Sequence, residues 1–67
     1  MSKEQALSRV ASMLAYEAYQ HIDAARDLPN MIPHTREALA IIRETAQALD
    51  ILPVVKVRLS MYYDCTL

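Results

Sequence analysis

The sequence predicts a mainly α-helical single domain spanning residues 1–67: an antiparallel helical hairpin (about 2–28 and 34–52) followed by a C-terminal β-strand (about 54–63), assembled as a dimer. Three observations predict this fold. Apolar residues recur at helical spacing through both long segments. Three prolines, Pro29, Pro33 and Pro53, divide a chain of 67 residues that contains no glycine. The last segment, VKVRLSMYY (residues 55–63), alternates apolar and polar residues, as strands do.

The first predicted helix begins with a capping signal. Ser2 stands three residues before Gln5, which is the spacing of a capping box. Pro29 ends the helix because the residue before a proline avoids helical geometry, and Asn30 is predicted to take the left-handed conformation that glycine usually supplies. At 3.6 residues per turn, one face is apolar and contains Leu7, Val10, Ala11, Leu14, Ala18, Ile22, Ala25 and Leu28.

The second predicted helix contains a short repeat, REALAII (36–42) followed by RETAQAL (43–49). A seven-residue spacing returns a residue to nearly the same face, so the repeat predicts a long apolar seam. The seam contains Ala38, Leu39, Ile41, Ile42, Thr45, Ala46, Ala48, Leu49 and Leu52. It is wider than one antiparallel helix covers. Either a second chain covers the excess, forming a four-helix bundle, or the C-terminal segment folds back over it.

The C-terminal segment has two interpretations. A strand would place Val55, Val57, Leu59, Met61 and Tyr63 on one face. The unbroken alternation and the β-branched valines favour this strand. The alternative is a helix beginning near Pro53, which makes an all-α three-helix arrangement. A lone strand has unpaired edges, so it predicts pairing with the same strand of a second copy or with an edge strand of a target protein.

Composition limits the function. The chain is 54% apolar and 22% charged, which indicates a folded protein. One cysteine excludes an intrachain disulfide, so oligomerisation is the expected source of extra stability. A net charge of −1 gives no overall attraction to nucleic acid or to an anionic membrane. The sequence shows no signal-like segment and no membrane-spanning run, and together with a single free thiol this predicts a cytoplasmic location.

No motif predicts catalysis, a cofactor or a metal site. Glu17 with His21, and His34 with Glu37, supply only two ligand types at helical spacing, whereas a zinc site needs three or four. Cys65 lies too close to the end of the sequence to be expected on a rigid scaffold. We therefore expect no enzymatic activity.

The function predicted is that of a small non-enzymatic regulator, inhibitor or adaptor, a homodimeric helical hairpin that binds a larger protein. The predicted partner-binding residues are Met13, Tyr16 and Tyr19, opposite the apolar face of the first helix, and Val55, Val57, Leu59, Met61 and Tyr63 of the strand. The alternative is a dimeric nucleic-acid-binding regulator that uses Arg36, Arg43, Lys56 and Arg58. Neighbouring acidic residues, Glu37, Glu44 and Asp50, offset that positive field.

Overall fold

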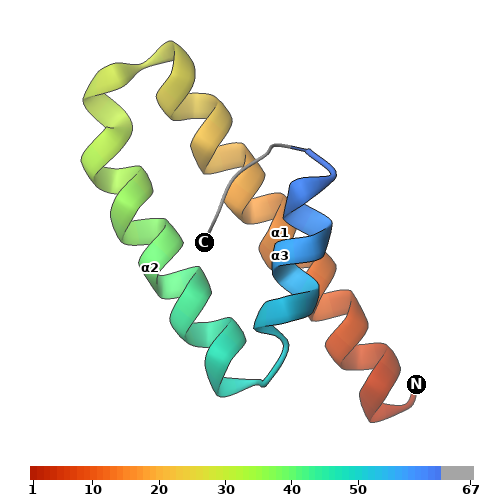
Figure 1. Ribbon diagram of the computed structural model, residues 1–67. Helices are drawn as coiled ribbons and strands as arrows, with labels where there is room; N and C mark the ends of the chain where they lie inside the picture. The colour runs from red at the N-terminus through yellow and green to blue at the C-terminus, as the bar shows by residue number, and fades with distance from the viewer. Residues whose placement is uncertain (63–67) are drawn as a thin grey trace.

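The computed structural model describes residues 1–62, and this part of the chain is mainly helical, as the sequence predicts (Figure 1). The order of elements is α1 (Lys3–Asp27), a short 3-10 helix η1 (Pro29–Met31), α2 (Ile32–Ala48) and α3 (Leu52–Ser60). Helices α1 and α2 form the expected antiparallel hairpin around η1, and α3 folds back beside α1 (Figure 1).

The predicted β-strand is wrong where it can be checked. Within residues 1–62 the structure contains no strand, α3 occupies most of the predicted segment, and the all-α alternative fits; Tyr63 lies outside the described residues. Val55 and Leu59 are completely buried, whereas Val57 between them is 65% exposed, so the buried spacing is four and not two. Pro53 stands in the first helical turn, where a proline is tolerated because no backbone N–H is needed there.

Both ends of α1 follow from local chemistry. The predicted capping box is confirmed: the Ser2 hydroxyl accepts from the Gln5 N–H at 3.1 Å, and the Ser2 N–H donates to Gln5 Oε1 at 3.0 Å. Helix α1 stops at Asp27, because Leu28, before Pro29, has a φ of −130° and a ψ of 83°. The left-handed conformation predicted for Asn30 is wrong, since Asn30 lies within η1.

The left-handed residue in the described part of the chain is Asp50, with a φ of 58°. It lies in a Schellman motif that ends α2 at Ala48, four residues before the predicted end at about residue 52. The Asp50 N–H donates to the Gln47 carbonyl at 3.1 Å, and the Ile51 N–H donates to the Ala46 carbonyl at 2.9 Å. Ile51 and Ala46 are both buried, which is the apolar contact typical of this motif. The turn therefore directs the chain into α3 without a glycine.

Replacing Asp50 by glycine should stabilise the protein. A side chain at positive φ is strained, and glycine relieves that strain, so we expect a gain of about 0.5 kcal/mol in the free energy of unfolding, after allowing for the greater freedom of unfolded glycine. Asp50→Val should lower it by about 1 to 2 kcal/mol. Urea unfolding measures both. Ala40→Gly on the exposed side of α2 is the control, with an expected loss of about 1 kcal/mol. A loss of stability in Asp50→Gly would contradict the expectation.

The core is small and lies mainly between α1 and the other helices. The buried apolar residues are Ala11, Ala15, Ala18, Ile42, Ala46, Ile51, Val55 and Leu59. Helix α1 contributes only alanines among these, and the two largest fully buried side chains, Val55 and Leu59, come from α3. An alanine face lets a neighbouring helix approach closely, and α3 packs far more against α1 than against α2. The C-terminal segment does fold back, but mainly over α1.

The apolar seam predicted on α2 is only partly covered. Ile42 and Ala46 are buried, whereas Ile41 is 58% exposed and Leu49 is 40% exposed. Towards the η1 end of the hairpin, the buried residue of α2 is polar: Thr35 donates its hydroxyl to the His21 carbonyl of α1 at 3.1 Å. This hydrogen bond fixes α2 to α1 where no apolar side chain is fully buried.

Candidate protein-binding surface

Three tyrosines meet where α3 ends beside the middle of α1. The rings of Tyr19 and Tyr62 are stacked, with centroids 4.7 Å apart and planes at 24°. Tyr16 lies 5.9 Å from Tyr19 and 6.4 Å from Tyr62, in tilted arrangements. Such geometries are favourable contacts between aromatic rings. These ring contacts therefore join α1 to the end of α3.

Much of this cluster remains accessible. Tyr16 and Tyr62 are each 49% exposed, and Met13, one turn before Tyr16 on α1, is 68% exposed. Tyr19 is partly buried and packs against the core. We call these four residues, Met13, Tyr16, Tyr19 and Tyr62, the tyrosine surface. Exposed tyrosine and methionine side chains are enriched where proteins contact one another.

Tyr62 was not among the residues predicted from the sequence. The strand interpretation placed it on the polar face, away from the other predicted contact residues. A helix starting at Pro53 puts Tyr62 seven residues after Val55, on the face that packs against α1. The seven-residue spacing from Val55 would therefore have identified Tyr62 under the helical alternative.

The remaining predicted contact residues divide into buried and exposed ones. Val55 and Leu59 lie in the core, where a partner cannot reach them while α3 stays docked, so they are removed from the predicted surface. Val57 and Met61 are 65% and 81% exposed on the outer side of α3. On α1, the rings of Tyr16 and Tyr19 are in contact and Met13 is exposed one turn before Tyr16. Tyr19 packs partly against the core and so does not lie opposite the packed face, where it was predicted.

Arg58 fixes α3 to α1 beside this surface. Its Nη1 donates to the Ser8 carbonyl and, at 2.7 Å, to the Ser12 hydroxyl; its Nη2 donates to the Ser8 hydroxyl at 2.8 Å. Hydrogen bonds from a charged guanidinium are among the stronger ones. Arg58 therefore has a structural role: it joins α3 to α1 through Ser8, which is 50 residues away in the sequence.

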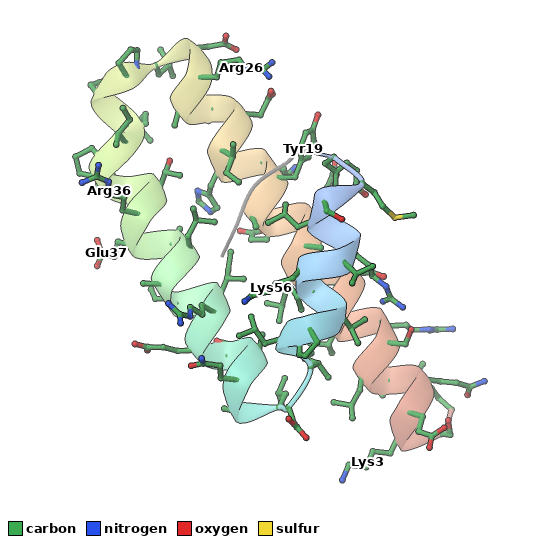
Figure 2. All side chains as sticks on the ribbon, viewed as in Figure 1. Lys3, Tyr19, Arg26, Arg36, Glu37 and Lys56 are labelled. Carbon is green, nitrogen blue, oxygen red and sulfur yellow. The ribbon has the colours of Figure 1, made fainter. Side chains whose placement is uncertain are left out.

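The predicted nucleic-acid-binding residues do not converge. Arg58 is directed onto α1, and Arg36 and Arg43 are exposed on α2. Figure 2 shows Arg36 projecting away from the other helices, whereas Lys56 projects from α3 in the direction of α2. The four cations therefore do not form one patch.

Two hollows flank Arg58 between α1 and α3. One, of about 260 Å³, is mainly apolar and is lined by Glu4, Leu7, Ser8, Ala11, Ile51, Val54 and Arg58. The other, of about 330 Å³, is lined by Ser12, Ala15, Arg58, Met61 and Tyr62. Arg58 lines both hollows and separates them. The hollows remain beside α3 because this nine-residue helix covers only part of α1.

One pair of ionisable side chains lies close together on α1. His21 Nε2 lies 3.5 Å from Glu17 Oε1, one helical turn away, with both side chains partly exposed. Within residues 1–62, no three histidine, cysteine or acidic side chains are grouped as a metal ion would require. In the same part of the chain, none of the helices has the length and hydropathy needed to cross a bilayer.

Comparison with protein families, with curated proteins and with solved structures finds no significant match to this chain.

Proposed function

We propose that this chain is a small non-enzymatic protein-binding regulator, inhibitor or adaptor that acts as a homodimer and binds a larger protein through the tyrosine surface. The observation that supports this most is the contact of three tyrosine rings, Tyr16, Tyr19 and Tyr62, of which Tyr16 and Tyr62 remain 49% exposed.

The arrangement of the rings favours binding. The stack holds Tyr19 and Tyr62 against each other, so these side chains lose little further conformational entropy when a partner binds. Tyrosines held in this way offer apolar faces and a hydroxyl that donates and accepts. Methionine beside them adapts to an irregular partner surface, and Met13 occupies that position.

The test is a binding assay with matched variants. The tagged protein is used to capture proteins from the source cell, and the affinity of each purified candidate is then measured. Tyr16→Ala should weaken binding at least about tenfold, because central aromatic contacts carry most of the binding energy in protein interfaces. Met13→Ala should also weaken binding, through the loss of an exposed apolar side chain beside Tyr16. Ile41→Ala is the control, since Ile41 is an apolar side chain, 58% exposed, on α2.

The outcome depends on the pattern of variants and not on capture alone. Circular dichroism should show that all three variants keep the helical content of the wild type. A partner that binds Tyr16→Ala and Met13→Ala as tightly as the wild type, or that is lost with Ile41→Ala, would remove the tyrosine surface from the proposed function.

A further inference from the structure

Helix α3 is apolar on two opposite sides. Its inner side, with Val55 and Leu59, is fully buried against α1. Its outer side carries Val54, Val57 and Met61, which are 41%, 65% and 81% exposed. An apolar helix face is normally buried against another element. Within the described residues, α3 is covered on its inner side and open on its outer side.

The outer residues form a straight stripe. Positions 54, 57 and 61 are spaced by three and four, so they lie along one face of the helix. The ends of the stripe, Val54 and Met61, are seven residue steps apart, or about 10 Å along the helix axis. We call Val54, Val57 and Met61 the outer stripe.

The two ends of the outer stripe differ in shape. At the Val54 end, the 260 Å³ hollow opens between α3 and α1, with Leu7, Ala11 and Ile51 in its lining. At the other end, Met61 is the most exposed of the large apolar side chains in the described chain. An unbranched methionine is well suited to filling an irregular apolar hollow. A projecting side chain and a hollow thus lie on one face, seven residues apart.

We propose that the outer stripe binds the outer stripe of a second copy, with the two α3 helices antiparallel around a two-fold axis between Val57 and Arg58. This axis brings Met61 of each copy opposite Val54 of the other, at the mouth of the hollow. The contact is isologous, so it closes as a dimer and leaves no free end for further growth. It rests on the homodimeric part of the proposed function and assigns the surface that forms it.

Charge is compatible with this pairing. An axis near Arg58 brings two guanidinium groups into the same region, which would oppose association if they were free. Each is instead hydrogen-bonded to Ser8 and Ser12 of its own α1, which holds it to one side of the outer stripe. The stripe itself carries no charged side chain.

The exposed area also favours a second copy. The chain exposes 4843 Å², whereas a compact monomer of 7.6 kDa exposes roughly 4,300 Å². A stable interface removes about 800 Å² from each partner. The excess of about 540 Å² per chain is smaller than that and corresponds to a small interface, below about 1,200 Å² in total. Covering it would add apolar burial that the alanine-rich core lacks.

The first experiment is sedimentation equilibrium of the purified chain. We expect twice the chain mass for the wild type. Val57→Lys and Met61→Lys should each raise the dissociation constant of the dimer at least about tenfold, because a charged side chain would be buried without a partner. The control is Ile41→Lys, at an equally exposed apolar position on α2, which should remain dimeric.

A second experiment tests the register. In a Cys65→Ser background, Val57→Cys places a thiol next to the proposed axis, and mild oxidation should give a covalent dimer; Ile41→Cys should not. A monomeric wild type at millimolar concentration would overturn the inference, and so would a dimer that dissociates with Ile41→Lys but not with Val57→Lys. With either of these two results, binding of a larger protein that still depends on Tyr16 would contradict the dimer contact and support the tyrosine surface.

Discussion

Leu59→Ala is expected to lower the free energy of unfolding by about 2 to 5 kcal/mol, the usual range for removing a buried leucine side chain. Leu59 is fully buried and is one of the two largest side chains in the core. The whole chain is expected to be stable by roughly 3 to 10 kcal/mol. The substitution should therefore remove a large part of the free energy of unfolding and shift the urea midpoint far downward, which urea titration followed by far-ultraviolet circular dichroism measures.

The control for this substitution also distinguishes helix from strand. Val57→Ala removes an apolar side chain two residues away that is 65% exposed, and its effect should stay within about 0.5 kcal/mol. Both variants are compared at concentrations where sedimentation shows monomers, so that dimer formation does not contribute. In a strand, Val57 and Leu59 would share one face, and equal losses for the two would contradict the packing of α3 described above.

Ala15→Leu should have the second large effect, a loss of about 1 to 3 kcal/mol. Ala15 is completely buried in the cluster that contains Val55 and Leu59, and it also lines the hollow beside Met61 and Tyr62. A larger side chain there forces α3 away from α1. Leucine and alanine are both good helix formers, so the substitution hardly changes the helix propensity of α1. The loss of stability would therefore measure how closely α3 packs against α1.

The tyrosine stack offers a second measure of this displacement. If α3 moves away, Tyr62 separates from Tyr19, and the near-ultraviolet circular dichroism of the tyrosines should fall. Ala40→Leu on the exposed side of α2 is the matched control and should change stability by less than about 0.5 kcal/mol. A fully stable Ala15→Leu protein with an unchanged tyrosine signal would mean that α1 and α3 do not pack through their alanine face.

The two long helices were predictable because their signals are local and mutually consistent. Ser2 and Gln5 determine the start of α1, and Pro29 determines its end. Each signal lies within a few residues of the helix end that it determines. The apolar periodicity of residues 7–25 then identified most of the face that packs, but not Ala15, which is completely buried. The end of α2 was harder, because an aspartate replaces the glycine that marks a Schellman turn, and nothing in the sequence separates Asp50 from the other surface aspartates.

The C-terminal helix was not predictable to the same degree. Residues 55, 57 and 59 satisfy a spacing of two, and residues 51, 55 and 59 satisfy a spacing of four, in the same short segment. The choice depends on α1, whose alanine face accepts Val55 and Leu59 from a helix. Likewise, the sequence showed Arg58 as a free cation, because its acceptors on Ser8 and Ser12 lie on a distant segment.

The alanine face of α1 also bears on the order in which the chain is made. Ala11, Ala15 and Ala18 are synthesised long before Val55, Leu59 and Arg58, which cover them. During that interval the nascent chain contains α1 and α2 without their third helix. A leucine-rich face left open in this way would favour aggregation, whereas alanine exposes little apolar area. The large apolar side chains of this contact belong to α3, so they emerge when the surface that buries them is already present.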